Sequence, residues 1–258
     1  MIGQGPPDFQ LRTSLRQAVI VDAASLRSDD SRNQAPSPFA DALRQSIYLD
    51  LLGSLVGVNG VTISVLSTGL TQSSQLTAIT PPGIDLMTPP DDSAEPSSRL
   101  AWAVDHHLHR AFTRIVVIVA DVPALPTRTV ATTLSSLASA DVIVGTSTET
   151  GVYLLAVRDL RGLRAVEAAG AASGLDRLVV SSIAAPVGED RITLRYVERR
   201  DRLVIDRLDP VREAVLATPN AAPRTATLLR IHNDEARAQT NLSVFGGFEA
   251  DFGRGLDR

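Results

Sequence analysis

The chain contains no cysteine and no lysine, and each absence excludes a class of chemistry. Without cysteine it has no disulfide framework, no thiolate zinc site and no cysteine nucleophile. Without lysine it has neither an amine for a Schiff base nor a lysine clamp for phosphate. All 25 basic residues are therefore arginines, whose planar guanidinium group can bind phosphate with a different geometry.

Excess charge and long apolar runs are also lacking. The formal net charge is −4 and the isoelectric point is about 5.6, which gives no electrostatic case for binding nucleic acid or an anionic membrane. No apolar run reaches the roughly 18 residues of a membrane span. The polar N-terminus lacks the apolar core of a signal peptide. We therefore expect a cytoplasmic protein with no nucleic-acid partner and no membrane partner.

The apolar content that is present suits a globular protein. Hydrophobic residues make up 44% of the chain and charged residues 21%. A length of 258 residues allows one α/β domain with tails, or two small domains. Residues 1–16 and the polar, glycine-rich residues 233–258 have the composition of flexible tails. We predict a single domain over residues 17–232.

Strand and helix patterns alternate along this domain. Strands are expected at residues 17–23, 60–67, 115–119, 140–145, 152–157 and 178–182, with a hairpin formed by residues 191–197 and 202–205. Helices are expected at residues 39–55, 99–113, 127–139, 160–172, 210–216 and 225–232. Residues 71–98 are rich in Pro, Ser and Thr, and we predict a long functional or mobile loop there. The alternation predicts a three-layer α/β fold around a mainly parallel sheet.

The strand at residues 115–119 carries the most informative feature of the chain. It is a continuous β-branched run, as in strands that are buried on both faces of a parallel sheet, and Asp121 follows it closely. Ligands of open α/β sheets bind outside the carboxyl ends of strands, so Asp121 is a candidate ligand for a divalent metal that neutralises phosphate charge. The alternative is that Asp121 caps the next helix or stiffens a turn.

Sequence motifs of other nucleotide-binding and hydrolytic folds are absent. No G-x-G-x-x-G turn follows the first strand, and the chain has no G-x-x-x-x-G-K-[ST] loop. It has no G-x-S-x-G nucleophile elbow either. A Rossmann dinucleotide site, a P-loop enzyme and an α/β-hydrolase are therefore all disfavoured.

Two segments resemble a known family. Residues 120–126, ADVPALP, are similar to the Thr-Asp-x-Pro-Asp-Leu-Pro signature of small bacterial glycosyltransferase-A-like proteins. Residues 141–145, DVIVG, and residues 148–155, TETGVYLL, are similar to that family's Asp-Val-Val-Leu-Gly and Glu-Asp-Gly-Gly-Tyr-Tyr-Leu-Ile segments. The family consists of nucleotide-diphospho-sugar transferases, includes the arsenosugar-biosynthesis-type glycosyltransferases, and is related in fold to 2-phospholactate guanylyltransferase.

This resemblance implies a three-layer α/β/α sandwich of glycosyltransferase-A type, a nucleotide or nucleotide sugar as ligand, and Mg²⁺ or Mn²⁺ as cofactor. Residues 205–210 are weakly similar to the family's Asp-x-Asp-Thr-Pro-x-Asp segment, and residues 223–226 to the start of its closing helix. The implied site consists of Asp121 and Asp206 as metal ligands, Glu149 as a catalytic acid–base group or further ligand, and Arg27, Arg32 and Gly151 as nucleotide contacts.

The chain also departs from the family pattern. The family's first loop, Lys-x-Pro-x-Pro-Gly-x-x-Lys-Thr-Arg-Leu, is replaced by residues 23–39, which have no lysine and no glycine and gain Asp29 and Asp30. Two carboxylates near a phosphate site repel the ligand unless a metal bridges them. The second Asp of the first motif is Ala124, and that of the late segment is Leu208.

Two functional hypotheses remain open. In the first, the protein is a metal-dependent transferase that acts on a nucleoside diphosphate sugar or on a nucleoside triphosphate. In the second, it is a degenerate homologue that kept the scaffold, lost the phosphate loop and acts as a binding or regulatory protein with a protein partner. The altered first loop favours the second hypothesis slightly.

A cluster of Asp105, His106, His107 and His109 on the predicted helix at residues 99–113 is a further metal candidate. Imidazole and carboxylate groups can bind zinc, but the spacing matches no known zinc signature. Val104 and Leu108 belong to the apolar face of this helix, so we expect the histidines on its flank.

Overall fold

The computed structural model describes residues 15–26, 37–90, 96–147, 151–168, 192–200, 203 and 208–234. Its strands are β1 Gln17–Asp22, β2 Val61–Leu66, β3 Asp85–Met87, β4 Arg114–Val119, β5 Val142–Ser147, β6 Val152–Val157 and β7 Leu194–Arg200. Its helices are the 3₁₀ helix η1 Ala23–Leu26, α1 Pro38–Val56, α2 Leu70–Ile79, α3 Pro96–His109, α4 Thr127–Ser136, α5 Leu160–Ala168, α7 Leu208–Ala217 and a helix over residues 223–234.

The strands of the described residues form one seven-stranded sheet in the order β3-β2-β1-β4-β6-β5-β7. Strand β6 is antiparallel to its neighbours β4 and β5, and every other pair is parallel. Strand β1 lies inside the sheet and pairs with β2 and β4, so that Val19 lies between Ile63 and Val116. Its residues Ala18 to Val21 are fully buried, as expected where helices cover both faces of a sheet. The predicted α/β architecture is confirmed.

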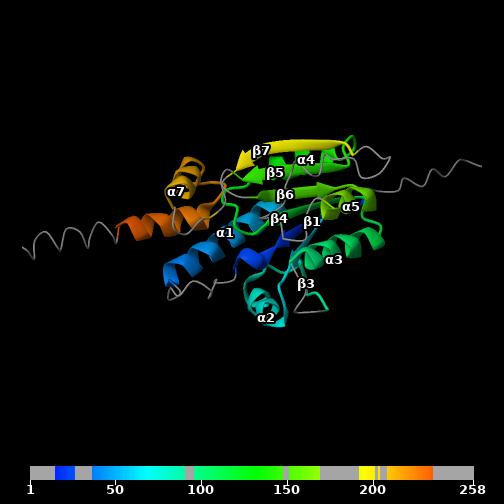
Figure 1. The fold of residues 1–258 in the computed structure, drawn as a ribbon. Coiled ribbons are helices and arrows are strands. Elements are labelled where there is room, and N and C mark those ends of the chain that lie inside the picture. The colour runs from blue at the N-terminus through cyan, green and yellow to red at the C-terminus, as the bar shows by residue number, and fades with distance from the viewer. Residues whose placement is uncertain are drawn as a thin grey trace, which may run out of the picture.

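The helices pack in two groups. Helix α3 packs against β1 and α5, and α1 packs against α4, which also contacts β4. Figure 1 shows α3 and α5 side by side. It also shows α7 and the helix over residues 223–234 near α1, and the arrows of β5 and β7 point toward these three helices. The carboxyl ends of the parallel strands therefore face this second group of helices.

A second hydrophobic cluster joins α1, α7 and the helix over residues 223–234 to the segment that follows β4. Its buried members are Leu43, Ile47, Ala124, Val211, Val215, Ala222, Ala226 and Leu229. These residues come from α1, from the segment after β4, from α7 and from the helix over residues 223–234 with its preceding turn. The cluster holds the C-terminal helices against α1 and against the segment just beyond β4.

A buried carboxylate on α1 secures the same helices. Asp50 accepts hydrogen bonds at Oδ2 from the Thr225 backbone N–H (2.9 Å) and hydroxyl (2.8 Å), and at Oδ1 from the Arg224 backbone N–H (3.2 Å). The Arg224 guanidinium lies 3.4 Å from Oδ1. The first N–H groups of a helix lack partners within the helix, and its dipole favours an anion there. Asp50 thus caps the helix over residues 223–234 from a distant part of the chain.

The prediction of a long loop over residues 71–98 is wrong, because these residues include most of α2, all of β3 and the start of α3. Helix α2 is rich in Ser, Thr and Gln and buries only Gln72 and Leu76, so it shows no apolar stripe. Strand β3 has three residues and too little length for an alternating pattern. Both elements form because their neighbours supply partners for them.

Most of the other predicted elements agree within a few residues where the structure describes them. The predicted hairpin does not, because β7 continues through residues 198–200, where its turn was expected, and pairs in parallel with β5. The predicted helix at residues 39–55 is α1, and the predicted strand at residues 115–119 is most of β4. The predicted strand at residues 178–182 lies outside the described residues, and of residues 202–205 only residue 203 is described. The limits of the domain at residues 17 and 232 stay a prediction.

Replacing Asp50 should test its role as a cap. We expect Asp50→Ala to lower the free energy of unfolding by at least about 2 kcal/mol, since it leaves buried donors of Thr225 without an acceptor. The matched variant Asp41→Ala removes an exposed carboxylate of the same helix and should cost less than about 1 kcal/mol. Urea unfolding measures both variants, and equal losses would contradict the proposed cap.

The end of α3 offers a stabilising substitution. Ala111 has a φ of 63°, and the N–H of Phe112 donates to the His107 carbonyl at 3.1 Å to close the helix. Glycine adopts this left-handed conformation without strain, so Ala111→Gly should raise the free energy of unfolding by about 0.5–1 kcal/mol. The control Ala131→Gly, within α4, should lower it by about 1 kcal/mol. A loss of stability in both variants would refute the prediction.

Candidate functional site

The strand order reverses between β1 and β4. From β1 the chain proceeds outward to β2 and β3, and it returns through α3 to β4 on the other side of β1. Open α/β sheets bind their ligands outside the carboxyl ends of the strands at such a point. The candidate site is therefore the region beyond the carboxyl ends of β1 and β4, called the carboxyl edge below.

Two carboxylates lie at the carboxyl edge. Asp22 is the last residue of β1, and its carbonyl accepts a hydrogen bond from the Ala120 N–H at 2.9 Å. Asp121 is the next residue after Ala120, is only 7% exposed, and its carbonyl accepts a hydrogen bond from the Leu203 N–H at 2.9 Å. The placement of Asp121 just beyond β4 follows the sequence prediction, and its role as a metal ligand stays a prediction.

Gly151 lies at the same edge because β6 runs against its neighbours. Its φ is 66°, and its carbonyl accepts a hydrogen bond from the Ser147 N–H at 3.0 Å, which closes the turn between β5 and β6. Ile118 pairs with Leu154 in the antiparallel ladder. Because β4 and β6 run in opposite directions, the residues that follow β4 and those that precede β6 lie at the same edge of the sheet. The topology thus brings two of the predicted site residues together.

Ala124 shows what the chain lost from the family motif. Its φ is 54°, a left-handed conformation that Asp and Asn adopt more readily than other residues with a side chain. The acidic residue of the family signature would suit this backbone. Alanine preserves the turn but removes the carboxylate, and its side chain belongs to the second hydrophobic cluster.

Two further polar residues at the carboxyl edge were missed in the sequence. Arg99 is buried in the first turn of α3, and its Nη2 lies 4.0 Å from Asp22 Oδ1. Ser25 lies in η1, directly after β1, and its hydroxyl is buried. A signal for Arg99 was present, because it shares helical spacing with the buried Ala103 and His107 and therefore lies on the inner face of α3.

The remaining predicted site residues, Arg27, Arg32, Glu149 and Asp206, lie outside the described residues. Within the described part of the chain, no group of three or more His, Cys, Asp or Glu side chains could hold a metal ion. A Mg²⁺ ion does not need such a cage, because it is commonly held by one or two carboxylates together with substrate phosphates and water. The buried carboxylate of Asp121 therefore fits this kind of site.

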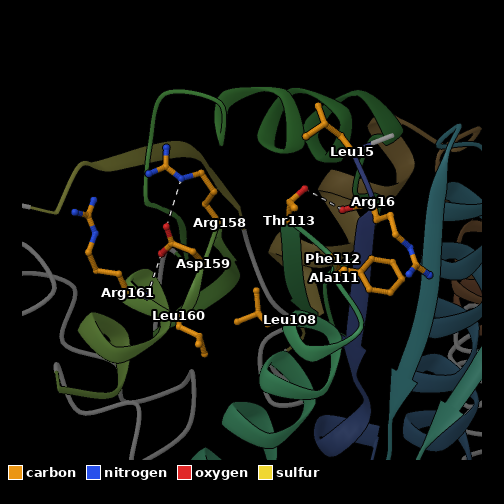
Figure 2. Close-up of a pocket in the computed structure, with 10 residues that line it drawn as sticks. All are labelled: Leu15, Arg16, Leu108, Ala111, Phe112, Thr113, Arg158, Asp159, Leu160 and Arg161. Atoms are coloured by element: carbon orange, nitrogen blue, oxygen red, sulfur yellow. Dashed lines mark hydrogen bonds and ion pairs between the residues drawn. The ribbon is translucent and has the colours of Figure 1, made fainter. Parts of the chain in front are cut away.

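A pocket of about 830 Å³ lies at the opposite edge of the sheet. Its lining includes the apolar Leu108 and Phe112 and the arginines Arg16, Arg158 and Arg161 (Figure 2). The Arg16 guanidinium lies 4.4 Å from the centre of the Phe112 ring. Figure 2 shows these two side chains next to each other. Because this pocket borders the start of β1 and the end of β6, it is remote from the edge at which the fold class binds ligands.

Two arginines of this pocket, Arg158 and Arg161, bind a structural carboxylate. Asp141, directly before β5, lies 2.6 Å from Arg158 Nη2 and 2.9 Å from Arg161 Nη2, and it accepts a hydrogen bond from the Thr193 N–H at 2.9 Å. Burial acts to raise the pKa of Asp141, but the Thr193 N–H and the two arginines outweigh it and hold the pKa below its usual value. The network joins β5 to α5 and to the start of β7.

The expectation that the histidines lie on the flank of α3 is wrong for His107, which is completely buried. Its Nδ1 donates to the Ala103 carbonyl at 2.9 Å, so in the neutral ring Nε2 accepts from the Ser64 hydroxyl at 3.1 Å. Burial is the main reason why the pKa of His107 is lowered. His109 is exposed and contacts Asp105 at 3.2 Å. His107 is thus a hydrogen-bonded core residue, since both of its ring nitrogens are engaged.

The sheet order with its antiparallel β6 is that of the nucleotide-diphospho-sugar transferase fold. A structure from Desulfovibrio desulfuricans G20, described as a "putative nucleotide-diphospho-sugar transferase", aligns with a TM-score of 0.67 and 15% identity over 86% of this chain and 97% of that chain. The 4-diphosphocytidyl-2C-methyl-D-erythritol synthase of Anaerococcus prevotii DSM 20548 aligns with a TM-score of 0.52 and 11% identity over 78% and 95% of the two chains.

The family match falls on the segment that carries the motifs. Residues 51–169 match the model of the family described as "Uncharacterized protein conserved in bacteria (DUF2064)". The predicted resemblance to a divergent glycosyltransferase-A-like family is thereby confirmed. Rv0371c of Mycobacterium tuberculosis H37Rv, whose structure contains manganese, aligns with a TM-score of 0.45 and 15% identity over 79% of this chain and 100% of that chain.

A search of curated proteins gives no match to this chain. Among the helices that the structure describes, none has the length and apolar character needed to cross a membrane.

The buried imidazole of His107 should make stability depend on pH. Because its pKa is lower in the folded protein than in the unfolded chain, the unfolded chain binds the proton more readily. Stability should therefore fall as the pH drops below the ordinary histidine pKa of about 6.5. Urea unfolding of the His107→Gln variant should show a smaller fall between pH 8 and pH 5 than the unmodified protein shows.

The control for this measurement is His109→Gln, which removes an exposed imidazole from the same helix. It should retain the pH dependence of the unmodified protein. If His107→Gln and His109→Gln give the same pH dependence, His107 does not cause it.

Proposed function

We propose that this protein binds a nucleoside diphosphate sugar at the carboxyl edge and transfers the sugar to an acceptor, with nucleotidyl transfer from a nucleoside triphosphate as the related possibility. The observation that carries the proposal is Asp121, a buried carboxylate directly beyond β4 at the reversal of strand order. Asp22 lies on the adjacent strand, so acidic groups gather where the fold class holds its ligand.

The chemistry assigned to each residue follows from its type and place. Asp121 would hold Mg²⁺ or Mn²⁺, which neutralises the negative charge of the diphosphate leaving group when it is bound. Asp206 is proposed as a second ligand, and Glu149 as a general base or further ligand, since a carboxylate can serve in either way. Arg27 and Arg32 are proposed to contact the phosphates through their guanidinium groups.

Gly151 contributes a feature of the backbone to the proposed site. Its positive φ allows a close turn between β5 and β6, and the absence of a side chain leaves space for the ligand to approach the chain. In the sequence, Thr150 stands where the family has the first glycine of a Gly–Gly pair. We therefore expect a more restricted ligand site here than in proteins with the Gly–Gly pair.

The alternative is a degenerate homologue that acts by binding a protein partner. It is favoured by the first loop, which has no lysine and no glycine, and by Ala124, where the family signature has a carboxylate. Both changes remove groups that bind metal or phosphate and leave the scaffold intact. The two hypotheses differ in one measurable property, which is a metal-dependent response to nucleotides.

A thermal-shift screen tests the proposal. The purified protein is heated with UDP-, GDP-, ADP- and dTDP-sugars and with nucleoside triphosphates, each with Mg²⁺, with Mn²⁺ and with neither. A ligand at 100 times its Kd stabilises a protein by about 2.7 kcal/mol, so the correct nucleotide should raise Tm by several degrees. The rise should require the metal and should vanish in Asp121→Asn.

The matched control is Asp209→Asn, which removes an exposed carboxylate from α7 and should leave the rise unchanged. A nucleotide response that survives in Asp121→Asn would exclude Asp121 as the metal ligand. No response to any nucleotide at millimolar concentration would favour the degenerate homologue, and a protein partner would then be sought.

A further inference from the structure

Two buried polar atoms near the end of β1 lack hydrogen bonds. Arg99 Nε and Ser25 Oγ are inaccessible to solvent, and neither has a hydrogen-bond partner within the part of the chain that the structure describes. Arg99 comes from α3 and Ser25 from η1, so two separate elements place hydrogen-bond donors without an acceptor at the carboxyl edge. Buried polar groups are nearly always hydrogen-bonded, and exceptions indicate a functional constraint or a missing ligand.

The interaction of Arg99 with Asp22 does not satisfy the hydrogen-bonding capacity of the guanidinium group. The distance of 4.0 Å from Nη2 to Asp22 Oδ1 exceeds that of a hydrogen bond, and Oδ1 already accepts one from the Ala24 N–H at 3.1 Å. The close, two-pronged contact that arginine makes with carboxylates is therefore absent from this pair. Asp22 holds the guanidinium of Arg99 at the carboxyl edge and leaves the Nε of Arg99 available.

Two other arginines with an unbonded Nε are in a different situation. The side chain of Arg200 is 20% exposed and donates to Glu198 at 2.8 Å, and that of Arg212 is 32% exposed and lies near Asp209. Water can reach parts of these guanidinium groups. The Arg99 side chain is only 8% exposed, so its charge depends on partners within the protein or on a ligand.

We propose that Arg99 and Ser25 form a phosphate-binding subsite at the carboxyl end of β1, whose ligand is the diphosphate group of the nucleotide. This rests on the proposed function for the identity of the ligand. The planar guanidinium presents Nε and Nη donors in a fork that matches two phosphate oxygens, and the serine hydroxyl supplies a third donor. Because the chain has no lysine, the buried Arg99 supplies the positive charge that a lysine would otherwise bring to the phosphate.

The surroundings suit an anion in this position. Arg99 lies in the first turn of α3, where the unpaired N–H groups and the helix dipole add positive potential. Asp22 would repel a phosphate, but its charge is balanced by Arg99, and a divalent ion at Asp121 would reduce the repulsion further. The diphosphate would then lie between the arginine subsite and the metal, near the end of β1.

The test uses inorganic pyrophosphate as the probe, in EDTA and at low ionic strength, with binding to the full chain measured by calorimetry. The protein should bind pyrophosphate without metal. Arg99→Gln should weaken binding by about 10- to 100-fold, as expected for hydrogen bonds to a charged ligand. Arg99→Lys should weaken it less, and Ser25→Ala should weaken it by a factor of up to about ten.

Arg110→Gln is the matched control. It removes the same charge from the exposed residue that follows α3, at the opposite edge of the sheet, and binding should be unchanged. Ser25→Ala removes only one hydroxyl from a folded segment, so it gives an answer even if Arg99→Gln does not fold. Circular dichroism establishes that each variant is folded before binding is compared.

The outcomes separate this inference from the proposed function. The subsite would be refuted if the unmodified protein did not bind pyrophosphate, or if the Arg99 and Ser25 variants bound it as tightly as the unmodified protein. Arg99 would then be a structural partner of Asp22. Pyrophosphate binding that depends on Arg99, without any metal-dependent response to nucleotides, would support the subsite and refute the transferase. A metal-dependent nucleotide response that the Arg99 and Ser25 variants retain would support the transferase and refute the subsite.

Discussion

The pairing of β1 with β2 on one side and with β4 on the other, both in parallel, is the constraint on which the rest of the structure depends. A parallel pair cannot be joined by a tight turn, so each connection must cross the sheet through a longer segment. The chain therefore returns from β3 through α3, and the ends of β1 and β4 are left open to a ligand. Asp22, Asp121 and Arg99 meet at one edge as a consequence.

The carboxyl edge is also where the protein keeps its second hydrophobic cluster and its buried cap. Ala124 in that cluster directly follows the segment that carries Asp121, and Asp50 holds the helix over residues 223–234 in place. The C-terminal helices thus lie beside the candidate site, and they are held there by packing and by charge-assisted hydrogen bonds. Stability and the shape of the site are coupled through the same residues.

The charged groups divide between two roles according to their partners. At the opposite edge, Asp141 is fully engaged by Arg158, Arg161 and Thr193, and such a network stabilises the joint between strands and helix. At the carboxyl edge, Arg99 is buried with an incomplete set of partners. All the groups of the Asp141 network are bonded, whereas the buried guanidinium of Arg99 keeps an Nε without a partner, and this contrast distinguishes the two edges.

Sequence periodicity was sufficient for the long elements and for the place of Asp121, since buried β-branched strands and α1 carry strong patterns of their own. It failed for α2, whose inner face holds only Gln72 and Leu76, and for His107, a buried residue whose Nε2 bonds to the distant Ser64. The sequence by itself determined the alternation of strands and helices, the absence of lysine and the family motifs. Only the tertiary structure decided that Arg99 and Ser25 share an edge with Asp121, because strand order, not distance along the chain, brings these residues together.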